Sequence, residues 1–192
     1  SVEGLIRNRY SGRTFIEGDD SRKSKAQSKY TPLREVLEGK RVLLVEDSIV
    51  RSTTMRVLIS RIRAVGKARE IHVRVACPPI VSPCFYGIDM STISELFAPR
   101  FMRAGRPLED TYAEMARDLG ADSLRYLSVE SIAKAVDRPP NELCRACLTG
   151  EYPTPHGQRL YEIALANSQN GSESASNGCR PLRTYEAHGA QI

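Results

Sequence analysis

The chain has 192 residues, enough for one domain or for one domain with a small appendage, and its net charge is +5 with a pI near 9.0. This mild positive excess fits an anionic ligand without requiring nucleic acid. No apolar run approaches the roughly 20 residues of a membrane span and no export signal is visible, so we expect a cytoplasmic protein without a membrane partner. In such a chain, five cysteines favour metal or cluster ligation over disulfides.

The first 41 residues form the most basic part of the chain. Residues 17–32 are polar and charged without a hydrophobic period, which predicts a flexible loop. Binding of this basic segment to nucleic acid is a weak alternative, because few aromatic residues, Tyr10, Phe15 and Tyr30, are interleaved with its charges. We therefore expect no nucleic-acid partner.

The most informative segment begins with four apolar residues, 42–45, which are followed at once by Glu46 and Asp47. This aliphatic run predicts a strand buried on both faces of a parallel sheet. Ligands of such sheets bind beyond the carboxyl ends of the strands, and the N-terminus of a following helix attracts anions. Two acids beside a hydroxyl-rich loop thus indicate a ligand with polyol and phosphate character and a divalent metal. The simpler alternative is that Asp47 or Ser48 only caps the next helix, although the loop is long for capping alone.

The remaining pattern alternates helices and strands, which is typical of an α/β fold. An apolar stripe formed by Met55, Leu58, Ile59, Ile62 and Val65 predicts a helix that ends at Gly66. Further predicted elements are a strand at 70–76 ended by two prolines, a capping box at 92–95, a helix at 108–119 with Leu108, Tyr112, Met115 and Leu119 on one side, a strand at 123–127, a helix at 129–136, one or two helical turns at 160–166, and disorder at 167–178.

Taken together, these residues resemble the phosphoribosyl-pyrophosphate (PRPP) signature of the type I phosphoribosyltransferases. The wider context is similar to the amidophosphoribosyltransferases, a family that uses glutamine at the start of purine synthesis. The segments that carry the resemblance are residues 8–16, 41–54, 78–89 with Pro-Cys-Phe-Tyr-Gly, 127–130, and 144–153 with Cys-Arg-Ala-Cys-Leu-Thr-Gly.

The resemblance implies an incomplete type I phosphoribosyltransferase fold, with a Rossmann-like parallel sheet and a helical C-terminal extension. It divides the chain into the transferase part (1–100), an extension with the Cys-x-x-Cys pair (101–155), and a terminal helix with a disordered tail (156–192). Because the glutaminase domain of the family is missing, we expect a fragment that is inactive alone, and Ser1 does not replace the nucleophilic cysteine of glutamine hydrolysis.

The resemblance also assigns the site residues. Glu46 and Asp47 face the ribose hydroxyls and help to hold Mg²⁺, and Arg13 and Lys29, with Arg22, contribute catalytic charge from a mobile flap at 13–33. A PRPP loop spans 46–54, and the residues that surround the 5′-phosphate are Ser48, Ile49, Val50, Arg51, Ser52, Thr53 and Thr54.

Several residues depart from the family pattern. Glu46 stands where an aspartate is usual, and Ser52 stands where a glycine is usual. If that glycine needs a positive φ or a close approach of the phosphate, the serine costs about 1 kcal/mol or more. In the flap, Gly18 and Asp20 replace the usual proline and glutamine.

The spacing Cys144-x-x-Cys147 is by itself compatible with half a zinc site, a redox dithiol, or half an iron–sulfur site. The resemblance implies a structural [4Fe–4S] cluster bound by Cys84, Cys144 and Cys147, with the fourth ligand outside this chain. Cys77 and Cys179 are the available substitutes, and Cys77 is expected to be a small buried thiol. For His72, His156 and His188, ordinary surface or core roles are expected.

The implied reaction transfers glutamine-derived ammonia to PRPP and gives 5-phosphoribosylamine, pyrophosphate and glutamate. Implied partners are purine nucleotides as feedback inhibitors and further copies of the full-length chain in a homo-oligomer, a tetramer. Two alternatives remain: a nucleobase phosphoribosyltransferase, which would not need the cysteine segments, and a non-catalytic PRPP or nucleotide sensor, which the departures favour.

Overall fold

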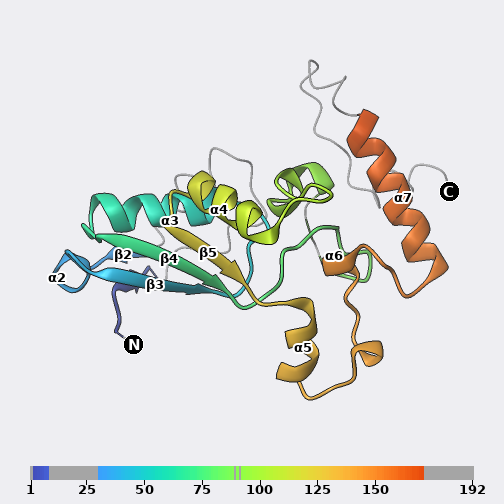
Figure 1. The fold of residues 1–192 in the computed structure, drawn as a ribbon, viewed down its shortest axis with the longest axis horizontal. Coiled ribbons are helices and arrows are strands. Elements are labelled where there is room, and N and C mark those ends of the chain that lie inside the picture. Colours follow the sequence, from blue (N-terminus) through green and yellow to red (C-terminus); the bar gives the residue numbers. More distant parts are fainter. Residues whose placement is uncertain (1, 9–29, 89, 91, 171–192) are drawn as a thin grey trace.

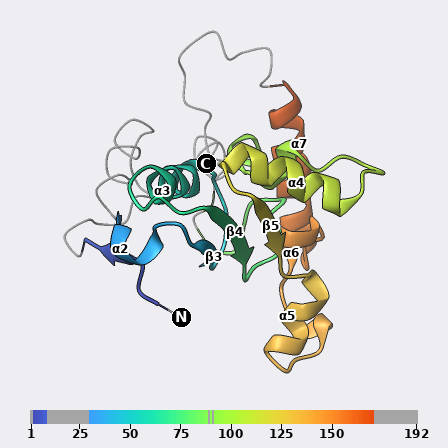
Figure 2. The same ribbon diagram turned by 60° about the vertical axis from the view of Figure 1, so that its left-hand side comes forward.

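The structure is a computed structural model that describes residues 2–8, 30–88, 90 and 92–170. Its centre is a parallel three-stranded sheet with the order β3-β4-β5 (Figure 1), formed by β3 (Arg41–Glu46), β4 (Glu70–Val75) and β5 (Ser123–Tyr126). Helices α3 (Thr53–Ala64) and α4 (Leu108–Leu119) cover one face of this sheet, as the turned view in Figure 2 also shows. The α/β fold class is therefore confirmed. The third strand, β5, lies beyond residue 100. The sheet therefore contains residues from both sides of the boundary expected at residue 100 between the transferase part and the extension.

The middle strand β4 shows how the hydrophobic pattern positions the sheet. Its apolar residues Ile71, Val73 and Val75 are buried beneath the helices, as period-two alternation predicts. The expectation for β3 is wrong in one respect, because this strand is not buried on both faces. Leu43 and Val45 are 62% and 68% exposed, since the described helices cover only the opposite face.

A short antiparallel pair precedes the sheet: β1 (Leu5–Arg7) pairs with β2 (Tyr30–Pro32), and α2 (Arg34–Leu37) follows. The expected flexible loop at 17–32 is thus wrong at its end, because its last three residues form a strand. The rest of that loop lies outside the described residues.

Helix α3 buries Met55, Leu58, Ile59 and Ile62, which confirms the predicted core stripe, whereas Val65 is 45% exposed. The predicted role of Gly66 is also different. The left-handed residue after α3 is Lys67, with φ 54°. Gly66 is instead a place of close approach, because a Cβ there would lie 2.7 Å from the carbonyl oxygen of Ile62.

Helix α4 begins and ends where the sequence predicts, and Gly120 follows it with φ 80° as a left-handed C-cap. Its predicted buried face needs one correction. Leu108 is 55% exposed, and Thr111 and Ala116 are buried beside Met115 and Leu119. The two 3-10 turns before this helix, η2 (Ile93–Glu95) and η3 (Ala98–Arg100), follow the predicted capping box, which is present between Thr92 and Glu95.

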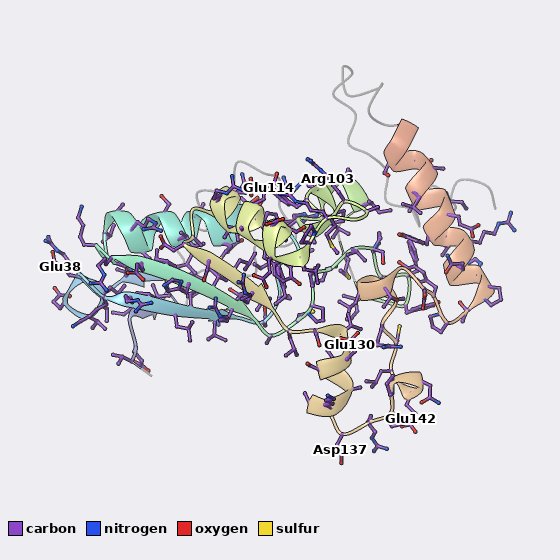
Figure 3. The ribbon with its side chains drawn as sticks, viewed as in Figure 1. Glu38, Arg103, Glu114, Glu130, Asp137 and Glu142 are labelled. Atoms are coloured by element: carbon purple, nitrogen blue, oxygen red, sulfur yellow. The ribbon has the colours of Figure 1, made fainter. Side chains whose placement is uncertain are left out.

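The C-terminal part is helical and lies at one end of the sheet. It contains α5 (Val129–Ala135), η4 (Pro140–Glu142), α6 (Ala146–Thr149) and α7 (Pro155–Asn170). Figure 3 shows α5 and η4 in a projecting lobe that carries Glu130, Asp137 and Glu142, at the far end from Glu38. The expectation of one or two turns at 160–166 is wrong, because α7 has 16 residues and includes 167–170 of the segment expected to be disordered. Among the described residues, none of the helices combines the length and apolarity needed to span a membrane.

Candidate PRPP site and cysteine segments

The two predicted acids lie where the first parallel strand ends. Glu46 is the last residue of β3, and its carbonyl oxygen accepts a hydrogen bond from the backbone N–H of Ala76 at 2.9 Å, just beyond β4. The Asp47 carboxylate is close enough to Cys77 to help to raise the pKa of that thiol, although burial is the larger cause. The acids therefore lie at the carboxyl edge of the sheet, the edge at which open parallel sheets bind ligands.

Local hydrogen bonds shape the chain around these acids. The N–H of Asp47 donates to Glu46 Oε1 at 3.1 Å, and the N–H and hydroxyl of Ser48 donate to Asp47 Oδ1 at 2.5 and 3.3 Å. Asp47 thus stabilises the start of the loop rather than the helix. The N-cap of α3 is Ser52, and its side chain makes no capping hydrogen bond. The alternative that Asp47 or Ser48 merely caps the helix is therefore wrong.

Three interactions attach the loop to the segment 95–100. Arg51 Nη2 forms an ion pair with Glu95 Oε2 at 2.9 Å, the N–H of Phe97 donates to the Val50 carbonyl at 2.9 Å, and Arg100 Nη2 donates to Ser52 Oγ at 3.1 Å. They hold three successive loop residues. The sequence could not predict these interactions, because their partners are far apart along the chain. In the two side-chain contacts the separations are 44 and 48 residues.

The ion pair changes the role expected for Arg51. Burial alone would raise the pKa of Glu95, but the hydrogen bond and charge of Arg51, with bonds from Thr92, bring that pKa below its ordinary value. The guanidinium of Arg51 is directed at a protein carboxylate. Any charge that it adds near a phosphate is already balanced by Glu95.

The other loop residues divide into buried and accessible ones. Ile49 is 3% exposed and belongs to the hydrophobic core, so it can offer a ligand only its backbone. Ser52 has φ −79° and ψ −15°, an ordinary right-handed conformation, so this position does not require the positive φ that would strain a serine. Thr53 and Thr54 form the first turn of α3, where backbone N–H groups lack partners within the helix. That turn contains no acidic residue.

The structure does not test the predicted flap residues. Arg13, Arg22, Lys29, Gly18 and Asp20 lie outside the described residues, and their roles stay predictions.

The segment with Cys84 is bound directly to the segment with Cys147. The N–H groups of Val81 and Ser82 donate to the Cys147 carbonyl at 2.9 and 3.1 Å, and the buried Ser82 hydroxyl donates to the Ala146 carbonyl at 2.7 Å. Tyr152, which packs against Phe85 with ring centroids 5.2 Å apart, donates its hydroxyl to the Pro83 carbonyl at 2.5 Å. The structure therefore brings together two motifs that are 60 residues apart.

The thiols interact electrostatically. Burial raises the pKa of Cys147 to about 11, and Cys77, Cys84 and Cys144 contribute further in that order. The described residues nevertheless contain no group of three or more His, Cys, Asp or Glu arranged to hold a metal ion. Cys77, expected to be a small buried thiol, is only half-buried, and burial together with the charge of the Asp47 carboxylate raises the pKa of its thiol.

The histidines behave as expected where they are described. His72 is part of the sheet, with Nδ1 2.9 Å from Ser123 Oγ and Nε2 3.1 Å from Glu70 Oε2, and His156 is exposed. His188 and Cys179 lie outside the described residues.

No family model matches the chain, but curated proteins and solved structures do. An amidophosphoribosyltransferase from Methanocaldococcus jannaschii is 48% identical over 153 residues, which are 79% of this chain and 30% of that protein. The chain is therefore homologous to one part of the amidophosphoribosyltransferases. It spans about a third of the length of the curated relatives that it matches.

Two solved structures agree with this family and with the type I phosphoribosyltransferase fold. One is the glutamine PRPP amidotransferase from B. subtilis complexed with ADP and GMP, with a TM-score of 0.60 and 45% identity over 79% of this chain and 32% of that one. The other is described as the allosteric regulatory enzyme of purine biosynthesis, with a TM-score of 0.61 and 44% identity over 79% of this chain and 31% of that one.

Proposed function

We propose that this chain supplies the PRPP-binding part of an amidophosphoribosyltransferase. The parent enzyme transfers glutamine-derived ammonia to C1 of PRPP, and the products are 5-phosphoribosylamine, pyrophosphate and glutamate, in the first step of purine synthesis. One observation carries the proposal: Glu46 and Asp47 stand at the carboxyl edge of a parallel sheet, next to a loop that leads into α3, in a chain of this family.

In this proposal the two carboxylates accept hydrogen bonds from the ribose hydroxyls. The loop from Ser48 to the first turn of α3 surrounds the 5′-phosphate. Unpaired N–H groups of that turn, together with the hydroxyls of Thr53 and Thr54, donate to it, and the helix dipole favours its negative charge. The attachments of the loop to the segment 95–100 support this role, because a phosphate loop held in place loses little entropy on binding.

Mg²⁺ fits the residues present. This ion is usually bound by one or two carboxylates together with substrate phosphates rather than by a complete set of protein ligands. Glu46 and Asp47 would be those carboxylates. When bound, Mg²⁺ would neutralise the charge of the pyrophosphate leaving group.

A [4Fe–4S] cluster fits the donor chemistry of Cys84, Cys144 and Cys147. The hydrogen bonds between residues 81–82 and residues 146–147, which hold the Cys84 and Cys147 segments together, support it. The raised pKa of Cys147 means that the free protein carries a thiol there, which must lose its proton to become a ligand. The cluster would supply a structural link between these segments, because the transfer reaction needs no redox step.

The B. subtilis relative is complexed with ADP and GMP. By analogy with this relative, we propose that purine nucleotides inhibit the parent enzyme. We also propose that the parent enzyme is cytoplasmic and assembles into a tetramer. The relatives are amidophosphoribosyltransferases, so the comparisons give no support to the alternative of a nucleobase phosphoribosyltransferase. A non-catalytic PRPP sensor remains the second candidate, because Glu46 and Ser52 depart from the family pattern.

Titration calorimetry of the 192-residue chain with PRPP and Mg²⁺ tests the binding role. We expect Asp47→Asn to weaken PRPP binding at least about tenfold, since it removes a charge that accepts hydrogen bonds. Asp137→Asn is the matched control on the projecting lobe (Figure 3), and its affinity should equal that of the wild type. Equal affinities of all three proteins would contradict the assignment of the site.

A second measurement separates the enzyme from the sensor. The native protein isolated from its source should release pyrophosphate from PRPP when ammonia and Mg²⁺ are added. Retained PRPP binding without any turnover would identify a sensor.

A further inference from the structure

Ser52 has an environment that capping does not explain. The residue is the N-cap of α3 and is only 7% exposed, yet its hydroxyl makes no capping hydrogen bond. The hydroxyl oxygen instead accepts a hydrogen bond from Arg100 Nη2 at 3.1 Å. An N-cap serine that faces an arginine rather than its own helix indicates a role other than helix initiation.

Arg100 is held in a fixed orientation by aromatic rings. Its guanidinium carbon lies 5.3 Å from the ring centroid of Phe97 and 5.7 Å from that of Phe101. The two rings pack edge to face, with centroids 5.1 Å apart, and both are buried. Such cation–π contacts hold the planar guanidinium in place, so its hydrogen bond to Ser52 costs little additional side-chain entropy.

The direction of this hydrogen bond has a chemical consequence. A guanidinium can only donate, so Ser52 Oγ is the acceptor, and the hydrogen of its hydroxyl is left to donate elsewhere. A hydroxyl that accepts from a cation is polarised and becomes a stronger donor itself. At the start of α3, where the helix dipole attracts negative charge, an anion would be a suitable partner for such a donor.

The rest of the segment prevents the loop from moving away. The N–H of Phe97 binds the Val50 carbonyl, and Glu95 binds Arg51, so the residues on the N-terminal side of Ser52 are also fixed. Phe97 thus supports the loop in two ways, through its backbone and through the ring beneath Arg100.

We propose that Arg100 is a positioning residue of the phosphate site, which acts through Ser52. It holds the serine hydroxyl in the loop and directs a polarised donor, with a positive charge behind it, to the 5′-phosphate of the ligand. This inference rests on the proposed PRPP-binding function. The proposal also explains what a serine adds at position 52. A glycine there could offer the phosphate a backbone N–H but no hydroxyl.

A double-mutant cycle on the 192-residue chain tests the inference, with ribose 5-phosphate and PRPP–Mg²⁺ as the probes in titration calorimetry. The variants are Ser52→Ala, Arg100→Gln and the double variant. Arg103→Ala is the control for loss of positive charge, because Arg103 lies near the start of α4 without a described hydrogen bond to the loop (Figure 3). Hydrogen exchange of the amides of residues 48–54 in the ligand-free chain is measured in parallel.

We expect Ser52→Ala and Arg100→Gln each to weaken ribose 5-phosphate binding about tenfold, and the double variant to be no weaker than either single one. Arg103→Ala should bind as the wild type does. Both Arg100→Gln and Ser52→Ala should speed exchange of the loop amides, which reports the contact without any ligand. Additive losses in the cycle, or equal losses for Arg100→Gln and Arg103→Ala, would overturn the inference.

Failure of the proposed function is distinguishable from failure of this inference. A wild-type chain that binds neither probe would refute PRPP binding and with it the phosphate role of Ser52. A wild type that binds both probes, with unchanged binding and loop exchange in Arg100→Gln, would refute only the positioning role.

Discussion

The ion pair between Arg51 and Glu95 offers the most direct test of how the candidate phosphate loop is held. We consider the substitution Glu95→Gln, which keeps the size of the side chain and removes its charge. Arg51 is 20% exposed and Glu95 is 42% exposed, and Arg51 Nε is a buried donor with no described hydrogen-bond acceptor. The change therefore leaves a poorly compensated guanidinium beneath the loop.

The magnitude follows from this partial burial. A hydrogen bond between charged groups contributes about 1.5 to 3 kcal/mol, whereas a fully exposed ion pair contributes up to about 1 kcal/mol. The intermediate exposure of Glu95 requires a discount for solvent screening, which leaves a loss of about 1 kcal/mol in the free energy of unfolding at pH 7. For a domain of this size that loss lowers Tm by about 2 to 4 °C.

The pH dependence has a definite sign. The pKa of Glu95 is lowered in the folded state, although burial opposes the effect, because Arg51 binds the carboxylate. The folded protein thus binds the proton more weakly than the unfolded chain does. The stabilisation is fully present above the ordinary pKa of a glutamate and is lost as the pH falls through the lowered value. The wild type and Glu95→Gln should therefore differ at pH 7 and converge in acid.

Urea denaturation at a series of pH values measures both quantities. Glu142→Gln is the matched control, because Glu142 pairs with Arg138 at 3.7 Å on the surface of the projecting lobe and should change the stability by less than about 0.5 kcal/mol. Equal effects of the two substitutions, or a difference between wild type and Glu95→Gln that persists in acid, would refute the argument.

Two further predictions concern the core and the cysteine segments. Ile59 of α3 is 1% exposed in the core between helix and sheet, so Ile59→Ala should cost about 2 to 5 kcal/mol in unfolding free energy by urea titration. Ser60→Ala on the exposed side of α3 should cost little, and similar losses for the two variants would contradict the assigned core. Tyr152→Phe removes the hydrogen bond to the Pro83 carbonyl and should cost about 1 kcal/mol, with faster amide exchange at Val81 and Ser82. Unchanged exchange there would mean that Tyr152 does not hold the Cys84 segment.

Local patterns predicted those elements that local chemistry determines. The end of helix α4 was predicted correctly because a glycine, Gly120, follows it, and this residue adopts the left-handed conformation that ends a helix. Strand β4 was predicted because its alternation places Ile71, Val73 and Val75 against the helices. The position of Glu46 and Asp47 at the sheet edge followed from the same logic, since a strand that ends in two acids carries them to its carboxyl end.

Tertiary packing determined what the sequence did not reveal. The exposure of Leu43 and Val45 depends on which face of the sheet the helices cover, and an aliphatic run contains no information on that choice. Helix α7 was underestimated because its apolar residues show only a weak stripe. Its N-terminal half is positioned by contacts from elsewhere, such as the ring of Tyr161 on Tyr152, with centroids 5.3 Å apart. The contacts of Arg51 and Ser52 with the segment 95–100 join residues that no local pattern relates.

The segment after β4 links the two predicted sites in space. The N–H of Ala76 is bound to the Glu46 carbonyl, and the charge of Asp47, together with burial, raises the pKa of the next residue, Cys77. A few residues further along, Val81 and Ser82 are bound to the backbone of Cys147. A single short connection therefore runs from the acids at the sheet edge to α6, the helix that contains Cys147, the second cysteine of the Cys-x-x-Cys pair. Because the hydrogen bonds at both of its ends involve backbone atoms, rigid binding at the cysteines would also restrain the edge where Glu46 and Asp47 stand. If a cluster binds these cysteines as proposed, it would stabilise the position of the two acids through this connection without taking part in the transfer reaction.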